Sequence, residues 1–135
     1  MPLTPAQMDD LMDRHFAFEM NDDVEGVLAT LAADACHDIV GAPDGPTIGH
    51  DATRATYEQL FADLAGEKIR TLHRAYGHNT LTDESLWIGR ASGRPLGFEG
   101  ADRPLRFRIL HVMTFDDDGL ILRENVWLDY PHIAT

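Results

Sequence analysis

The chain has 135 residues, enough for one domain with its own hydrophobic core, and its 44% hydrophobic and 25% charged residues are typical of a globular protein. The formal net charge is −12 with no basic cluster to offset it, which argues against binding to nucleic acid or to anionic membranes. The single cysteine, Cys36, excludes an internal disulfide, and no signal pattern or run of 18 apolar residues is present, so one cytoplasmic domain over residues 1–135 is expected.

Two amphipathic helices are expected at the start of the chain. Thr4 as N-cap, Pro5 at the first helical position and Gln7 are typical of a capping box. Apolar residues then recur at helical spacing, and the stripe includes a histidine: Met8, Leu11, Met12, His15 and Phe18. In residues 21–35, Asn21 or Asp22 is the expected cap, and the apolar stripe is Val24, Val27, Leu28 and Leu31.

A strand, a loop and a third helix are expected next. CHDIVG, residues 36–41, is predicted to be a short strand that ends at Gly41, and a Gly/Pro-rich loop follows it. Residues 50–64 are expected to form a helix capped near Asp51, with Tyr57, Leu60, Phe61 and Leu64 on its apolar face.

From Lys68 onward the pattern predicts strands, with a turn at TDES, residues 82–85, and a long loop over residues 93–104. The order is helix, helix, strand, helix and then three long strands that pair as a meander. This order indicates an α+β domain whose helices cover one face of an antiparallel sheet.

The last two strands, within RILHVMTFDDDGLILRENVW (residues 108–127), are expected to form a hairpin. A type I turn over residues 116–119, followed by Gly119 in the left-handed conformation, sets Phe115 opposite Leu120. Counting back then pairs Met113 with Leu122, His111 with Glu124, Ile109 with Val126 and Phe107 with Leu128. The other face pairs Val112 with Arg123, Arg108 with Trp127 and Arg106 with Asp129. His111 and Glu124 thus form a polar pair on an otherwise apolar face.

This polar pair has two interpretations. Burying an imidazole and a carboxylate is costly unless they satisfy each other, so His111 and Glu124 can be a self-satisfied structural pair in the core. Alternatively, Glu124 orients His111 on the wall of an apolar cavity, where burial and mutual attraction shift both pKa values. Coupled groups of this kind suit proton transfer near neutral pH.

The order of elements and several strings resemble the cone-shaped, cystatin-like fold of the nuclear-transport-factor-2-like superfamily, within it the SnoaL-like polyketide cyclase and ketosteroid isomerase branch. Residues 10–35 are similar to the paired opening helices of ketosteroid isomerases. HDIVG (37–41) is similar to their Asp-x-x-Gly strand end, ATYEQLF (55–61) to their third helix, and residues 111–129 to their closing hairpin. The resemblance covers nearly the whole chain and implies three helices packed on a curved antiparallel sheet that encloses an apolar pocket.

The resemblance also implies site residues. Asp38 matches the isomerase general base, which moves a proton beside a carbonyl, and Tyr57 matches a supporting tyrosine. The two oxyanion-hole donors of that family, a tyrosine and a protonated aspartic acid, match His15 and His111. Both donors are changed, which argues against a steroid isomerase and leaves a carboxylate and two imidazoles facing the pocket.

Two further branches of the superfamily imply other sites. Its epoxide hydrolases use an Arg-x-Asp motif with a second Asp on the final strand, whereas RFR (106–108) lacks an Asp and the final strand has Glu124 and Val126. Its scytalone-dehydratase-like and dehydrochlorinase-like members pair an Asp on the first helices with a His on a middle strand. Asp22 or Asp23 with His73 would imitate that pair, but the mixed pattern of residues 68–81 leaves the direction of His73 open.

The predicted function is acid/base catalysis, without cofactor or metal, on a small hydrophobic carbonyl compound. Asp38, or His111 oriented by Glu124, removes a proton next to the carbonyl, and His15 and Tyr57 donate hydrogen bonds to the enolate oxygen. Cyclisation, isomerisation and dehydration share this enolate and stay open. The residues expected to contact substrate are Tyr57, His73, Phe107, Ile109, Met113, Val126 and Leu128.

A different class of function is also considered. Metal-ligand spacings such as His-x-x-x-His and Cys-x-x-Cys are absent from the sequence, as are phosphate-binding glycine motifs. The alternative to an enzyme is a non-catalytic domain of the same fold that binds a small molecule or dimerises. A homodimer is expected through the outer face of the sheet, with Arg108 and Trp127 in the interface.

Overall fold

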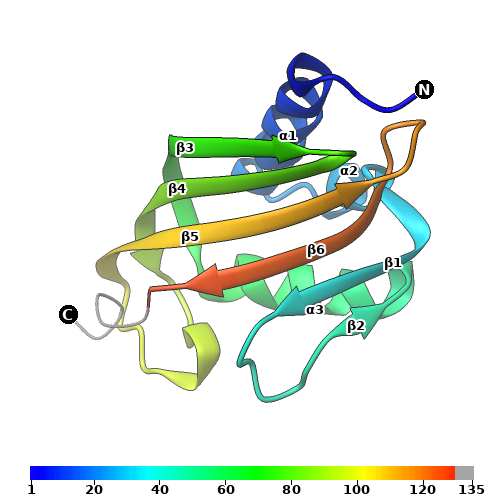
Figure 1. The fold of residues 1–135 in the computed structure, drawn as a ribbon. Coiled ribbons are helices and arrows are strands. Elements are labelled where there is room, and N and C mark those ends of the chain that lie inside the picture. The colour runs from blue at the N-terminus through cyan, green and yellow to red at the C-terminus, as the bar shows by residue number, and fades with distance from the viewer. Residues whose placement is uncertain (130–135) are drawn as a thin grey trace.

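The computed structural model of the protein describes residues 1–129. Three helices lie on one side of a curved six-stranded sheet (Figure 1): α1 (Pro5–Met20), α2 (Val24–Ala29) and α3 (His50–Asp63). The strands are β1 (Leu31–Ile39), β2 (Thr47–Ile48), β3 (Ala65–Gly77), β4 (Thr80–Ala91), β5 (Arg103–Phe115) and β6 (Ile121–Leu128), with a 3₁₀ turn at Pro95–Gly97. The predicted α+β class is confirmed.

The sheet has the order β2-β1-β6-β5-β4-β3. Strands β3 to β6 form an antiparallel meander of four strands rather than the three that were predicted. Strand β1 runs parallel to β6, so the sheet is mixed. Because of this pairing, the first strand and the last strand of the chain lie side by side in the middle of the sheet.

The first helix begins as predicted. The Thr4 hydroxyl oxygen accepts a hydrogen bond from the Gln7 backbone N–H, and the Gln7 side chain accepts one from the Thr4 backbone N–H. The residues of α1 that are buried against the sheet are Met8, Met12, His15 and Phe16. The sequence pattern therefore placed His15 correctly in the interior.

Two predicted boundaries are wrong. Helix α2 ends at Ala29, and Asp23 caps it by accepting from the Gly26 backbone N–H at 2.9 Å. The next residues belong to β1, which pairs with β6 at Leu31 and again from Cys36 to Ile39, with an irregularity between them. The predicted turn at TDES lies inside β4, and the chain reverses instead around Asn79, whose φ of 48° is a conformation that asparagine tolerates well.

The closing hairpin has the predicted turn and a different register. Gly119 has a φ of 92°, but Phe115 pairs with Ile121 and an extra residue, Leu122, forms a bulge before Thr114 pairs with Arg123. Leu120 and Leu122 are therefore 38% and 40% exposed, against the prediction, while Ile121 is buried. The register shifts by two residues: Met113 faces Glu124, His111 faces Val126 and Ile109 faces Leu128. The outer-face pairs shift too, with Asn125 opposite Val112, Trp127 opposite Leu110, and Asp129 beside Arg108.

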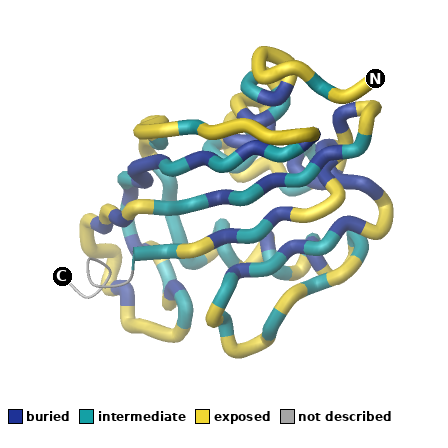
Figure 2. Tube along the Cα trace, in the orientation of Figure 1, coloured by how far each residue is buried: buried dark blue, intermediate teal, exposed yellow. Residues whose placement is uncertain are grey.

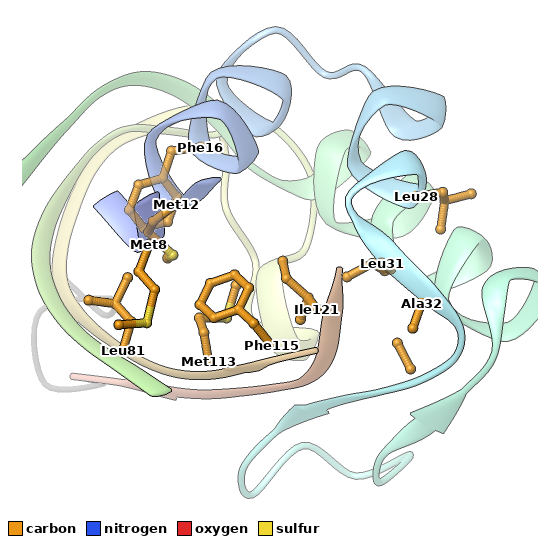
Figure 3. Close-up of a cluster of buried hydrophobic side chains, with 11 residues drawn as sticks. Met8, Met12, Phe16, Leu28, Leu31, Ala32, Leu81, Met113, Phe115 and Ile121 are labelled. Atoms are coloured by element: carbon orange, nitrogen blue, oxygen red, sulfur yellow. The ribbon is translucent and has the colours of Figure 1, made fainter. Parts of the chain in front are cut away.

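A hydrophobic core fills the space between α1, α2 and one end of the sheet. Met8, Met12 and Phe16 of α1 point toward Leu81, Met113 and Phe115 of the sheet (Figure 3). Buried and exposed residues alternate along β5, while β3 at the sheet edge is exposed over much of its length (Figure 2). The core therefore closes one end of the curved sheet and leaves the other end for a cavity.

No helix within residues 1–129 is long and apolar enough to cross a membrane. Trp127 is 39% exposed, and Arg108 forms an ion pair with Glu84. The homodimer through this face and the cytoplasmic location stay predictions.

Candidate active site

A cavity lies between the helices and the inner face of the sheet. The space open to the centre of a water-sized sphere measures about 80 Å³. One end of its wall is polar, formed by Glu19, His37, Tyr57, His111 and Glu124. The other end is apolar, and its wall includes Met20, Leu64, Trp87, Phe107, Ile109 and Leu128.

Five elements bring the polar residues together. His37 of β1 and Glu124 of β6 are neighbours in the parallel pairing, and His111 reaches Glu124 diagonally from β5. His15 and Glu19 are four residues apart on α1 and so lie on one face of the helix. Tyr57 comes from the buried face of α3.

Glu124 is at the centre of this cluster. Its Oε1 accepts a hydrogen bond from the Tyr57 hydroxyl at 2.8 Å and lies 3.8 Å from His37 Nε2. Its Oε2 lies 3.3 Å from His15 Nε2 and 3.6 Å from His111 Nε2. One buried carboxylate is thus shared by three imidazoles and a phenol.

The hydrogen bonds indicate that His15 is doubly protonated. The Thr30 hydroxyl donates its single hydrogen to the Val27 carbonyl, at 2.6 Å, so it accepts from His15 Nδ1 at 2.8 Å. His15 Nε2 faces two carboxylate oxygens, Glu19 Oε1 at 2.8 Å and Glu124 Oε2 at 3.3 Å, and must also carry a proton. Burial opposes this positive charge, but Glu124 and Glu19 outweigh it and raise the pKa of His15 to about 10.

The pKa values of the other members of the cluster are shifted in different directions. Burial would raise the pKa of Glu124, but the imidazoles of His15 and His37 hold this pKa well below its usual value. Burial lowers the pKa of His111, an effect that the negative charge of Glu124 only partly offsets. Burial and the two carboxylates raise the pKa of Tyr57. At neutral pH the site therefore holds a cationic His15, an ionised Glu124 and an uncharged His111.

The tautomer of His111 follows from the same geometry. Because Nε2 faces the Glu124 carboxylate, the single proton of the uncharged ring belongs on Nε2. Nδ1 then carries a lone pair, and this buried atom has no hydrogen-bond partner among the described residues. Such an unsatisfied buried nitrogen is uncommon in proteins and calls for an explanation.

The ligand atoms of His15, Glu19 and Glu124 lie within 4.8 Å of one another, a spacing that a metal ion could use. Binding a metal would require His15 to lose the Nε2 proton. A pKa of about 10 opposes that loss at neutral pH. The cluster therefore suits an internal ion pair better than a metal, and the expectation of no metal stays a prediction.

The structure brings most of the predicted site residues together. His15, Tyr57, His111 and Glu124 are in the polar cluster, although His15 lies behind Glu19 and Glu124 and is not among the described residues that line the cavity. The predicted substrate contacts Phe107, Ile109, Val126 and Leu128 line the cavity.

Three predicted positions are corrected. Asp38 points to the outer face of the sheet, where it is 21% exposed and lies 3.8 Å from Arg123, because strand alternation turns His37 inward instead. His73 is exposed on β3 and cannot pair across the cavity with Asp22 or Asp23; Asp22 lies on the cavity wall, whereas Asp23 caps α2. Met113 is buried in the hydrophobic core and does not line the cavity.

Two members of the cluster, His37 and Glu19, were not predicted. His37 is two residues from the apolar Ala35 and Ile39, and this alternation marks all three as inward-facing. Glu19 follows His15 by one helical turn, the spacing of a helical ion pair. Both signals were present in the sequence.

A family comparison identifies this architecture. Residues 12–124 match the family model described as a SnoaL-like domain. The chain belongs to the SnoaL-like domain family. No curated protein matches this SnoaL-like domain.

Solved structures share the fold of this SnoaL-like domain at low sequence identity. A candidate SnoaL-like polyketide cyclase from Jannaschia sp. CCS1 matches with a TM-score of 0.82 and 13% identity, covering 100% of this chain and 98% of that one. A candidate isomerase from Bacillus subtilis matches with a TM-score of 0.78 and 14% identity, covering 96% of this chain and 94% of that one. An LEH-like epoxide hydrolase from M. tuberculosis matches with a TM-score of 0.73 and 15% identity, covering 96% of this chain and 87% of that one.

Proposed function

We propose that this SnoaL-like domain catalyses acid/base chemistry on a small hydrophobic carbonyl compound, using its own side chains and no organic cofactor. The observation that carries the proposal is His111. It is an uncharged imidazole on the wall of an apolar cavity, with Nε2 directed at a carboxylate and Nδ1 without a partner. A histidine oriented in this way by a carboxylate is the usual arrangement of a general base.

Each residue of the cluster has a role in the proposed step. His111 takes the proton from the carbon next to the substrate carbonyl, the electron pair of that C–H bond forms the enolate double bond, and the carbonyl oxygen becomes negative. The Tyr57 hydroxyl turns from the carboxylates to donate a hydrogen bond to this oxygen. His15 is a positioning residue, because its positive charge keeps Glu124 ionised and Glu124 orients His111.

The fate of the enolate decides the overall reaction. Return of the proton at another carbon is an isomerisation, attack on a second carbonyl is an aldol-type cyclisation, and loss of a neighbouring hydroxyl as water is a dehydration. All three fit a cavity whose reacting end is polar and whose remaining wall is apolar. The structural neighbours include a candidate polyketide cyclase and a candidate isomerase, which supports this range of reactions.

The proposal is tested by hydrogen exchange, which needs no knowledge of the natural substrate. Cyclohexanone is incubated with the protein in D₂O, and loss of its α-proton NMR signal measures enolisation. His111→Gln is expected to lower the protein-catalysed rate by about 100-fold or more, because a positioned general base contributes at least that much. His73→Gln, a change at the exposed histidine of β3, is the matched control and should exchange at the wild-type rate.

The opposite result supports the non-catalytic alternative. If wild-type protein exchanges cyclohexanone and a panel of larger ketones no faster than the same protein after heat denaturation, no enolate forms in the cavity. The domain would then bind small molecules without turning them over.

A further inference from the structure

The cavity wall includes a hydrogen-bond donor that the proposed step does not use, the indole N–H of Trp87. Trp87 is only 7% exposed, and its ring stacks on Phe107 with 4.8 Å between ring centroids and 14° between planes. An indole N–H is a donor only, and in buried tryptophans it usually has an acceptor. Among residues 1–129, this N–H has no hydrogen-bond partner.

The surroundings of the indole nitrogen are open because the adjacent residue is a glycine. A Cβ atom added at Gly66 would lie 3.4 Å from Trp87 Nε1 and 3.0 Å from Met20 Cε. Gly66, Met20 and Trp87 all line the cavity. The N–H therefore lies beside a space that any other residue at position 66 would begin to fill.

The distance from this donor to the acid/base cluster follows from the sheet register. Trp87 pairs with Phe107, and Asp83 pairs with His111, so four residues separate the two positions along each strand. Four residues of a β-strand span about 13 Å between Cα atoms. A ligand that reaches both ends must carry polar atoms several bonds apart.

We propose that the substrate is a neutral compound with two oxygens, and that Trp87 donates a hydrogen bond to the second one. This inference rests on the proposed function, which places the reacting carbonyl at the polar end of the cavity. The second oxygen is a carbonyl, ether or hydroxyl on the far side of an apolar segment that packs against Trp87 and Phe107. A carboxylate is disfavoured, because Glu19, Asp22 and Glu124 line the same cavity and the chain carries a net charge of −12.

The experiment compares ketones with matched diketones on ¹⁵N-labelled protein. The probes are 2-octanone and 2,7-octanedione, with 2,6-heptanedione and 2,5-hexanedione to vary the spacing between the two oxygens. Only two indole resonances occur in this chain, and Trp127→Phe assigns them. At least one diketone should move the Trp87 N–H resonance downfield, whereas 2-octanone should not, and the Trp127 resonance on the outer face should stay in place.

Affinity gives a second readout. The best diketone should bind about fivefold more tightly than its matched ketone, which corresponds to about 1 kcal/mol for one neutral hydrogen bond. Trp87→Phe should reduce this ratio to about one. Gly66→Ala, which keeps the indole and covers its N–H, should reduce the ratio as well. Phe107→Leu is the matched control, because loss of the stacking partner should weaken ketone and diketone alike and leave the ratio unchanged.

The inference is overturned if no diketone moves the Trp87 resonance more than its matched ketone, or if the affinity ratio survives both Trp87→Phe and Gly66→Ala. Its failure is distinct from failure of the proposed function. A downfield shift of the Trp87 resonance without α-proton exchange supports the hydrogen bond from Trp87 and refutes the proposed catalysis. α-Proton exchange of ketones without any effect of the second oxygen supports the proposed catalysis and refutes the hydrogen bond from Trp87.

Discussion

Replacing Glu124 with glutamine tests the electrostatic design of the site. The side-chain shape is nearly unchanged, but the charge that holds His15 as a cation is halved, because only Glu19 remains at 2.8 Å. If the amide oxygen accepts from Tyr57, the NH₂ group faces the Nε2–H of His15 and that hydrogen bond is lost. If the amide flips, its oxygen accepts from His15, and its NH₂ group donates to the Tyr57 hydroxyl, which in turn donates to Glu19. The flipped orientation keeps these hydrogen bonds, so the main loss is the negative charge beside His15.

The expected loss of stability is large for a near-isosteric change. Removing one partner of a buried ion pair costs about 3–5 kcal/mol, and the remaining pair with Glu19 places this variant near 3 kcal/mol. For a chain of this length that corresponds to a drop of about 10 °C in Tm. The pKa of His15 should fall from about 10 toward its usual value, because its largest electrostatic stabilisation is gone.

Urea denaturation and an NMR titration of the histidine Cε1 protons measure the two effects. Glu84→Gln is the matched control, since Glu84 pairs with Arg108 on the sheet surface and such exposed pairs contribute about 0–1 kcal/mol. If Glu124→Gln is no more destabilising than Glu84→Gln and His15 still titrates near pH 10, the proposed ion-pair cluster does not exist.

Two further predictions concern pH and the hairpin turn. The pKa of His15 is raised from 6.5 to about 10 by folding, so its stabilising contribution is complete below pH 6.5 and is lost as the pH rises toward 10. Chemical denaturation should therefore show a decline in stability from pH 7 to 9 that His15→Gln removes, and an equal decline in both proteins would contradict the assignment. Gly119→Ala should destabilise the fold by about 1–2 kcal/mol, because Gly119 has a φ of 92° and the new methyl group would lie 3.1 Å from Leu11 Cδ1. Thermal denaturation checks this result, and Gly77→Ala, where the nearest atom to the new methyl group is 3.8 Å away, should change the stability much less.

Local signals in the sequence predicted much of the fold, and long-range pairing set the rest. The capping box at Thr4 and the helical spacing of His15 depend only on neighbouring residues, and both predictions are confirmed. Residues 31–35 have a helical pattern, yet they belong to a strand because β1 pairs with distant β6 on both sides of them, at Leu31 and from Cys36 onward. The bulge at Leu122 could not be predicted from the alternation of apolar and polar residues either. An extra residue in one strand changes which residues of the two strands pair, but not the alternation within the other strand.

The candidate site could be predicted only where a local sequence signal marked its residues. His111 and Glu124 were recognised because they interrupt an apolar face, which is a local signal. The match of Asp38 to a general base rests on the family resemblance alone, whereas the alternation of Ala35, His37 and Ile39 indicates that His37 faces the cavity instead. The indole N–H of Trp87 gave no signal, since the sequence alone does not say whether a tryptophan finds an acceptor.

The parallel contact between β1 and β6 has a consequence for biosynthesis. Cys36 and Arg123 are 87 positions apart and side by side, and the same pairing sets His37 beside Glu124, which also contacts His15 of α1. Contacts between such distant segments form slowly, and on the ribosome they must wait until β6 has emerged. Until then His15 has Glu19 as its single carboxylate neighbour, so the acid/base cluster is completed among the last steps of folding.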